Sequence, residues 1–423
     1  MDRRQFLGAG VAGVAAACGS VALTTTVNSF AANAELPDAD LFAEARKHFL
    51  FPTDVTYCNT GTLGASPHEV VNALTEGLRR LESTLPDWPY FQADGEPLTG
   101  YQEMRALRSE VGSLINAGPD EIALTQNATM GMSFIAGGLK LQPGDEVLTT
   151  DQEHSGGIGG WRLRARRSGI VVRELNLDAA LGGGPEAVLQ MFADAVTEKT
   201  RVFMFSQITS QFGIVLPAVE LCELARERGI LSVVDGAQAI GQIPVNVQAL
   251  DCDAFVASPH KWLLAPKGTG FMYLRNDIQD RIWSTLASSK FEDYEAGAFR
   301  FMQYGTGSVP ISEGLQAALV FMKKLGIERV SAWDIANNRR LRDGLKAISG
   351  ARLSSPADDR FAAAITTFRV EGVGARELQN ALWEREKVRV RAQGDDKGVR
   401  LCCHLYVSPG DVDRVLAVVR SLA

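Results

Sequence analysis

Short apolar runs alternate with longer amphipathic stretches through the middle of the chain. Seven runs have the length and composition of strands, at 121–125, 146–150, 170–175, 200–206, 230–235, 254–258 and 270–274. Several are almost continuously apolar, which is typical of strands that helices cover on both faces. The alternation therefore predicts an α/β fold with a mainly parallel sheet, in which ligands bind beyond the carboxyl ends of the strands.

The last third of the chain has a different pattern. A long helical stretch, three strand-like runs and a final helix follow one another, at 312–348, 363–370, 388–391, 399–402 and after Pro409. This order predicts a smaller α+β unit. We therefore expect a large domain at 35–310, which includes the N-terminal segment, and a small C-terminal domain at 311–423.

The first 34 residues have the pattern of an export signal. Arg3-Arg4 precedes a mildly apolar stretch of Ala, Gly and Val, and the small residues Ala32-Asn33-Ala34 end it. This order predicts a twin-arginine signal peptide at 1–34, the export machinery that reads it, and a periplasmic or secreted protein. Gly, Ser and Thr dilute the stretch, so we expect no stable membrane span. A retained anchor and a lipidated Cys18 are the alternatives.

Composition excludes several classes of partner. The 423-residue chain has 43 Lys and Arg against 50 Asp and Glu, a formal net charge of −7, and no basic run. Nucleic acid is therefore not an expected partner. The six Cys form no CxxC motif and the five His are scattered, so we expect neither a metal site nor a disulfide framework.

Two charged residues lie where predicted strands end. Asp235 directly follows an apolar run, so its carboxylate would project into the ligand crevice and need a cationic partner there. Lys261 follows the run that ends at Ser258 and has apolar neighbours. Desolvation lowers the pKa of a lysine and frees its amine for Schiff-base chemistry. Taken singly, a solvated Lys261 and an N-cap role for Asp235 are the simpler interpretations.

Two further segments complete the pattern. Ala128 and Thr129 begin a helix directly after a strand, where backbone N–H groups, a hydroxyl and the helix dipole would seat a phosphate. His154 follows the strand at 146–150, where its ring would stack on an aromatic ligand. An aromatic phosphate whose ring nitrogen attracts an anion and whose aldehyde reacts with a lysine is pyridoxal 5′-phosphate (PLP). One cofactor accounts for all these positions.

The order of these motifs is similar to that of a known superfamily. Asp235-Gly-Ala-Gln238, followed by Ser258-Pro-His260-Lys261-Trp-Leu-Leu-Ala-Pro-Lys-Gly, resembles the class V aminotransferases. The chain is most similar to their isopenicillin N epimerase-like branch. The resemblance extends from about Tyr57 to Asp413. It implies PLP-dependent transferase fold type I, with a mainly parallel seven-stranded sheet in the large domain, and a homodimer.

The resemblance implies a role for each matching residue. Lys261 would bind the cofactor covalently and move the α-proton, while Asp235 would pair with the pyridinium nitrogen. Gln238 would contact the ring hydroxyl, and His154 would stack on the ring. The other implied positions are the phosphate contacts Ala128, Thr129, Ser258 and His260, the pair Gly305-Thr306 that would reach the neighbouring subunit's site, and the substrate-binding residues Asn59, Gly61 and Arg400.

Some of these roles have rivals. Arg400 would clamp the substrate carboxylate, because a guanidinium fork matches that anion, but Arg389 and Arg391 are alternative clamps nearby. A core histidine is the alternative for His154, and a plain turn is the alternative for Gly305-Thr306.

Two departures from the superfamily pattern change the expected activity and one expected cofactor contact. Cysteine desulfurases carry a mobile loop with a cysteine where this chain has 388–394, which contains none, so desulfurase activity is not expected. Ser210 replaces a usual Asn, so we expect its contact near the ring hydroxyl to differ. Cys402 and Cys403 lie on a predicted strand and are expected to be packing residues.

The function that the sequence predicts is that of a PLP-dependent enzyme. It would act on an amino acid, or a substrate that contains one, through an external aldimine and an α-carbanion, as an isopenicillin N epimerase-like enzyme. C–S β-elimination and transamination share these first steps and are the alternatives. A non-catalytic exported binding protein is the alternative of another class, and intact Lys261 and Asp235 argue against it.

Overall fold

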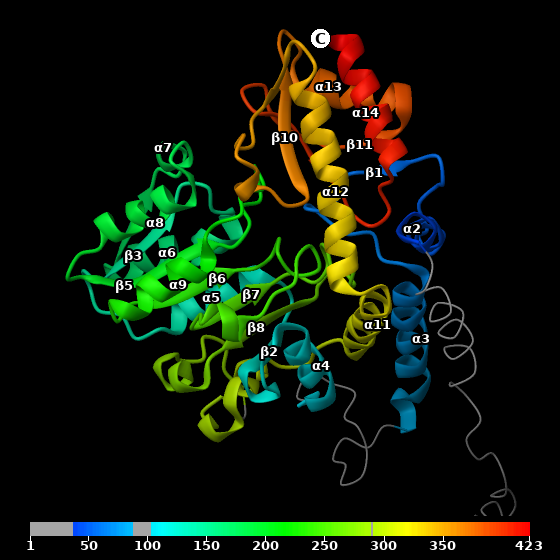
Figure 1. Ribbon diagram of the computed structural model, residues 1–423. Helices are drawn as coiled ribbons and strands as arrows, with labels where there is room; N and C mark the ends of the chain where they lie inside the picture. Colours follow the sequence, from blue (N-terminus) through cyan, green and yellow to red (C-terminus); the bar gives the residue numbers. More distant parts are fainter. Residues whose placement is uncertain (1–36, 88–102, 289–290) are drawn as a thin grey trace, which may run out of the picture.

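A computed structural model describes residues 37–87, 103–288 and 291–423 (Figure 1). The export signal expected at 1–34 lies outside these ranges. Within them, no helix combines the length and the apolar character that crossing a membrane requires.

A seven-stranded sheet forms the centre of the large α/β unit, in the order β2-β8-β7-β6-β5-β3-β4. Its strands are β2 (Ile122–Thr125), β3 (Glu146–Thr150), β4 (Val171–Leu175), β5 (Thr200–Ser206), β6 (Leu231–Asp235), β7 (Ala254–Ala257) and β8 (Gly270–Leu274). Neighbouring strands from β7 to β4 are parallel, and β8 is antiparallel to both β7 and β2. The mainly parallel sheet that the apolar runs predict is confirmed.

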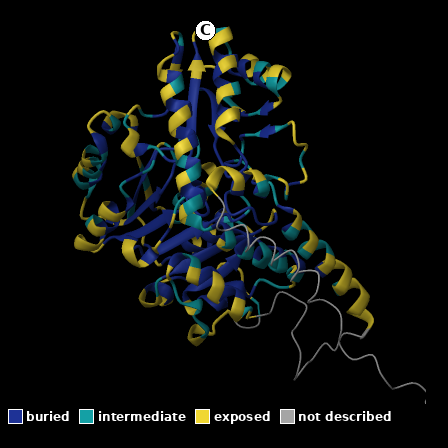
Figure 2. Cartoon of the chain, turned by 45° about the vertical axis from the view of Figure 1, so that its right-hand side comes forward, coloured by how far each residue is buried: buried dark blue, intermediate teal, exposed yellow. Residues whose placement is uncertain are grey.

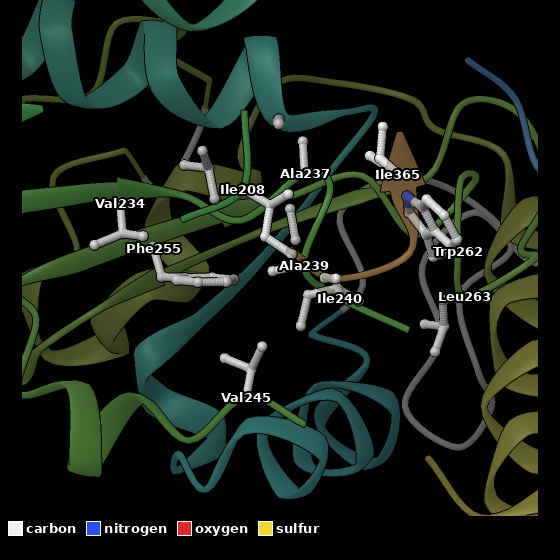
Figure 3. Packing of buried hydrophobic residues seen from close by; sticks show 14 of the residues in the cluster. Ile208, Val234, Ala237, Ala239, Ile240, Val245, Phe255, Trp262, Leu263 and Ile365 are labelled. Carbon is white, nitrogen blue, oxygen red and sulfur yellow. The ribbon is translucent and has the colours of Figure 1, made fainter. Parts of the chain in front are cut away.

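Helices cover this sheet and bury it (Figures 1 and 2). The helices of this unit are α4 (Arg105–Ile115), α5 (Ala128–Gly138), α6 (Ser155–Ser168), α7 (Asp178–Leu181), α8 (Gly184–Ala195), α9 (Ala218–Glu227) and α10 (Val247–Leu250). Strands β6 and β7 in the middle of the sheet are buried at every position, as expected for strands that are covered on both faces. Figure 3 shows part of this core, including Val234 of β6 and Phe255 of β7.

A second, four-stranded antiparallel sheet lies in the C-terminal part, in the order β12-β13-β10-β9. Its elements and the helices around it are β9 (Ala351–Leu353), β10 (Ile365–Val370), β12 (Arg391–Gly394), β13 (Gly398–Cys402), α12 (Ile327–Lys346), α13 (Ala375–Glu386) and α14 (Pro409–Leu422). The helical stretch predicted at 312–348 is two helices, α11 (Val309–Leu325) and α12, because Gly326 between them has φ +80°. A left-handed backbone at one glycine interrupts a helix.

The N-terminal segment contacts both parts of the chain. Helix α2 (Asp38–Arg46) precedes β1 (Thr56–Tyr57), and β1 pairs in parallel with β11 (Val388–Arg389). Helix α3 (His68–Thr84) then packs along α11 (Figure 1). Short 3₁₀ turns complete the described elements: η2 (Leu85–Asp87), η3 (Pro119–Glu121), η4 (Asn276–Arg281), η5 (Tyr294–Met302) and η6 (Asp359–Phe361).

Candidate active site

The carboxyl ends of the parallel strands meet at one edge of the central sheet. Ser206 ends β5 and lies directly beside Asp235, the last residue of β6. A cavity of about 260 Å³ opens at this edge. The sequence-predicted residues that line it are Gly61, Ala128, Thr129, His154, Ser210, Asp235, Gln238, Ser258, His260, Lys261 and Arg400. The fold thus gathers these residues from positions 61 to 400 around one space.

Lys261 lies in a turn after β7, in which its backbone N–H donates to Ser258 O over 3.0 Å. Burial lowers the pKa of its ammonium to about 8, which Asp235 opposes and Arg400 reinforces. The N-terminal segment closes on this turn, since Gly64 N donates to His260 O over 2.9 Å. A Cβ at Gly64 would lie 1.8 Å from the carbonyl oxygen of Lys261, so only glycine allows this approach. Lys261 therefore lies at the cavity with an amine that loses its proton more easily than that of an ordinary lysine.

Asp235 is the buried carboxylate of the cavity and is only 5% exposed. Its Oδ1 accepts from Ala237 N over 2.9 Å, in a tight turn directly after β6. A Cβ at Gly157 of α6 would lie 2.9 Å from Oδ2, so the absence of a side chain there leaves this oxygen clear. The free oxygen and the glycine beside it fit an aromatic ring whose cationic nitrogen meets the carboxylate.

The N-terminus of α5 forms a seat for an anion. Asn127 caps the helix, because its Oδ1 accepts from Met130 N over 2.9 Å. Ala128 N donates to Ser258 Oγ over 3.1 Å, which ties the helix start to the end of β7. Gly270 lets the two backbones approach, since a Cβ there would lie 2.4 Å from Asn127 N. Backbone N–H groups and hydroxyls at a helix start suit a phosphate group.

His260 completes this seat with one defined tautomer. Its Nδ1 lies 3.0 Å from Thr269 O, and a carbonyl only accepts, so Nδ1 carries the hydrogen. Burial lowers the pKa of His260. The ring is therefore neutral near pH 7.

His154 is the N-cap of α6. Its Nδ1 accepts from Gly156 N over 3.0 Å, so the hydrogen of the neutral ring is on Nε2. Burial first, and then the charge of Lys261, lower the pKa of His154. A neutral planar ring at the cavity wall fits the stacking role that the resemblance implies.

Glu153, which the sequence analysis did not single out, is a half-buried residue behind this wall. Its Oε1 accepts from Thr150 Oγ1 over 2.8 Å, and its Oε2 accepts from Ser206 Oγ over 2.6 Å. Burial raises the pKa of Glu153 to about 7, and the charge of Asp235 acts in the same direction. The only feature of the sequence that could have pointed to Glu153 is its position next to His154.

Two guanidinium groups face the cavity from the C-terminal sheet. Arg400 of β13 is buried and donates to Ser210 O over 2.6 Å and to Thr62 Oγ1 over 2.7 Å. Arg391 of β12 lines the same cavity and donates to Thr62 Oγ1 over 3.3 Å. The third candidate, Arg389, lies elsewhere, with its guanidinium 4.0 Å from the centroid of the Trp383 ring.

The remaining sequence-predicted residues, Asn59, Gly305 and Thr306, do not line the cavity. Asn59 is behind Arg400, and its Oδ1 accepts from Arg400 over 3.1 Å. Gly305 and Thr306 do not line the cavity of their own chain. Cys402 and Cys403 are fully buried, as expected for packing residues, and none of the described cysteines lines the cavity.

Comparisons with known proteins identify the family of the chain. The family described as aminotransferase class-V matches residues 66–415. Isopenicillin N epimerase of Amycolatopsis lactamdurans is 29% identical, over 91% of this chain and 99% of that protein. A cysteine desulfurase of Synechococcus elongatus is 31% identical, over 68% of this chain and 46% of that protein.

Two solved structures have the same fold, and one of them is described with PLP. A C-DES mutant with glycine covalently linked to the PLP cofactor has a TM-score of 0.79 and 26% identity, covering 89% of this chain and 99% of that one. The cystine C–S lyase C-DES in complex with its reaction product cysteine persulfide has a TM-score of 0.78 and 26% identity, covering 88% and 98%.

Proposed function

The chain belongs to the class V aminotransferase family and is a PLP-dependent enzyme, and from this premise we propose that it removes the α-proton of an amino-acid substrate that carries a second anionic group. The observation that carries this proposal is the composition of one cavity. A lysine whose pKa is lowered to about 8 shares it with a buried aspartate and two arginines. We propose epimerisation as the outcome, since isopenicillin N epimerase is similar over nearly its whole length.

The residues around the cavity fit PLP. The start of α5 with Ser258 and His260 would hold the phosphate, and Asp235 would face the ring nitrogen. His154 would lie against the ring and Gln238 would reach its hydroxyl. PLP, when bound, withdraws electrons from the α-carbon of an amino acid and so acidifies the α-proton.

Lys261 is the group that would take this proton at Nζ. An ordinary lysine is almost wholly protonated at pH 7 and cannot accept a proton. Because burial lowers the pKa of Lys261 to about 8, an appreciable fraction of its amine is neutral near pH 7 to 8. The surroundings of Lys261 therefore lower its pKa enough for its amine to act as a base near neutral pH.

The two arginines support a substrate with two anionic groups. Arg391 and Arg400 have no carboxylate within ion-pairing distance in the described parts of the chain. Two like charges in one cavity repel each other, and each matches a carboxylate bidentately. One would bind the α-carboxylate and the other a second carboxylate at the far end of the substrate.

A second candidate is C–S β-elimination. The cystine C–S lyase C-DES is similar in structure over most of this chain, and its named substrate has two carboxylates. Transfer of sulfur to a cysteine of the chain itself has less support, because the described cysteines are buried and lie outside the cavity. Transamination stays an alternative and shares the first proton transfer.

Product analysis separates these outcomes. The purified protein is titrated with L- and D-amino acids, mono- and dicarboxylic, and with cystine, while products are followed by chiral chromatography and by pyruvate release. Interconversion of enantiomers without pyruvate supports epimerisation, whereas pyruvate supports the lyase. A colourless protein that PLP does not reconstitute, without a band at about 420 nm that Lys261→Ala abolishes, contradicts the proposal.

We also propose that the protein is a homodimer in which Gly305-Thr306 contributes to the neighbouring site. An apolar groove of about 610 Å³ between α3, Phe51 and the start of α11 supports this, with Leu50 59% and Leu78 49% exposed. The test is the mass in solution by light scattering. Leu78→Glu should dissociate the dimer and lower PLP affinity, and a monomeric wild type contradicts the proposal.

Export by the twin-arginine route is likewise a proposal, supported by Arg3-Arg4 and the apolar stretch after it. Replacing both arginines by lysine should keep the protein in the cytoplasm with 1–34 attached. Unchanged export of that variant would contradict it.

A further inference from the structure

Trp262 is a buried hydrogen-bond donor next to the candidate catalytic lysine. It follows Lys261 in the chain, its side chain is fully buried, and its Nε1–H donates to Gln238 Oε1 over 2.8 Å (Figure 3 draws the Trp262 side chain). An indole N–H donates and never accepts. The atom of Gln238 that faces Trp262 must therefore be the carbonyl oxygen.

This bond fixes the direction of the whole Gln238 amide. With Oε1 at Trp262, Nε2 donates to Gly61 O over 2.9 Å. A reversed amide would set two donors against each other at Trp262 and two acceptors against each other at Gly61. Each buried donor or acceptor left without a partner costs about 1 to 3 kcal/mol, so the reversed orientation is excluded.

Nε2 carries two hydrogens, and Gly61 O takes only one of them. Gln238 lines the cavity and is 3% exposed. Its second N–H is thus free for an acceptor in the cavity. The ring hydroxyl oxygen of PLP, when ionised, is such an acceptor.

We propose that Trp262 is a positioning residue for the cofactor, which holds the Gln238 amide with its NH₂ group directed at the ring hydroxyl oxygen of PLP. This inference rests on the role that the proposed function gives to Gln238. Trp262 does not line the cavity in which the cofactor would bind. It acts through Gln238, and it follows directly on the lysine that would bind the same cofactor.

The Trp262 side chain is held in place by His404, which in turn contacts Asp334. The His404 ring packs edge-on against it, with centroids 5.1 Å apart and planes at 76°. His404 Nδ1 is 2.7 Å from Asp334 Oδ2 of helix α12, and both side chains are fully buried. An indole that is packed in this way has no space to turn, so the orientation of Gln238 is supported from α12 inward.

Removing only the indole N–H tests the proposal. Trp262→Phe keeps an aromatic ring, and we expect the PLP dissociation constant of the apoprotein to rise about three- to tenfold. The visible absorbance of the loaded protein should titrate at higher pH, because an oxygen that has lost a donor holds a neighbouring proton more tightly. Trp333→Phe is the matched control: its Nε1–H donates to Val407 O over 3.0 Å, away from the cavity, and neither value should change.

A double-mutant cycle shows whether Trp262 acts through Gln238. In a Gln238→Ala background, Trp262→Phe should cause no further change in PLP affinity. An equal fold-change in both backgrounds would overturn the proposal and leave a plain packing role. If Trp262→Phe does not fold, judged by circular dichroism of the apoprotein, Gln238→Glu replaces it, since a carboxylate accepts from Trp262 but has no N–H to donate. Unchanged PLP affinity of Gln238→Glu would overturn the proposal too.

These results differ from a failure of the proposed function. A wild-type apoprotein that binds no PLP contradicts the proposed function. Wild-type binding together with an unaffected Trp262→Phe contradicts only the role of Trp262.

Discussion

Arg391 and Arg400 are direct partners across the antiparallel strands β12 and β13, and both line the candidate active site. Like charges directly opposite each other destabilise a sheet unless a counter-charge is present. Burial and the charge of Arg400 lower the pKa of Arg391. The two guanidinium groups therefore suit an anionic ligand. Binding of a dicarboxylic substrate would relieve the repulsion between them.

We expect Arg391→Gln to distinguish substrates by their charge. The loss of one charge-assisted bond should raise KM for dicarboxylic amino acids about tenfold or more and leave monocarboxylic ones nearly unchanged. Arg389→Gln is the control, because Arg389 stacks on Trp383 outside the cavity. Equal effects of Arg391→Gln on both substrate classes would argue against a second anion site.

The lowered pKa of Lys261 sets the pH dependence of cofactor loading. Only a neutral amine attacks an aldehyde, so the rate at which the apoprotein acquires its visible band with PLP should rise with pH to a midpoint of about 8. Nα-acetyl-lysine with PLP over the same pH range is the reference. A protein midpoint as high as that of this reference would show that Lys261 is not desolvated.

Glu153 should make the stability of the fold depend on pH. Its pKa is about 7 in the folded state and near 4.5 in the unfolded one, so the folded protein binds more protons between these values. Stability from this group therefore falls as pH rises from about 4.5 to 7 and stays low above that. Glu153→Gln removes this cost and should stabilise the apoprotein by about 1 to 3 kcal/mol at pH 8 but little at pH 4.

Thermal unfolding at the two pH values measures this effect. Glu174→Gln is the control, because Glu174 belongs to a partly exposed ion pair with Arg162. A Glu153→Gln variant that is destabilised equally at both pH values would mean that its hydrogen bonds to Ser206 and Thr150 outweigh the cost of the buried charge.

Two glycines of α6 allow a matched test of the space beside Asp235. A Cβ at Gly157 would lie 2.9 Å from Asp235 Oδ2, so Gly157→Ala should displace the carboxylate and raise the PLP dissociation constant about tenfold. Gly159→Ala meets no atom within 4 Å. It should leave PLP affinity unchanged and stabilise the helix by up to about 1 kcal/mol. Equal PLP affinity in the two variants would argue that Oδ2 does not face the cofactor.

Local patterns in the sequence were sufficient for the central sheet. Its strands are short apolar runs whose periodicity and flanking turns are encoded within a few residues, and the observed bounds of β3, β5 and β8 match the predicted ones. The lysine and aspartate at strand ends could also be found in this way, because parallel strands bring their carboxyl ends to one edge.

Contacts between distant segments could not be predicted from such patterns. Arg389 and Arg391 are two residues apart and would face the same side of one continuous strand. In the structure, β11 ends at Arg389 and pairs with β1, whereas β12 begins at Arg391 and pairs with β13, so only Arg391 reaches the cavity. The pairing of the N-terminal segment with β11, and of β12 with the C-terminal sheet, therefore determines which arginine reaches the cavity.

The sequence by itself thus determined the α/β class, the cofactor and the residues at the strand ends, because these depend on local periodicity and on motifs of neighbouring residues. Only the tertiary structure decided which arginines line the cavity, that the pKa of Glu153 is raised by desolvation and by the charge of Asp235, and that Trp262 donates to the amide oxygen of Gln238. Burial and hydrogen-bond direction depend on residues far apart in the chain, and they exist only once the elements have packed.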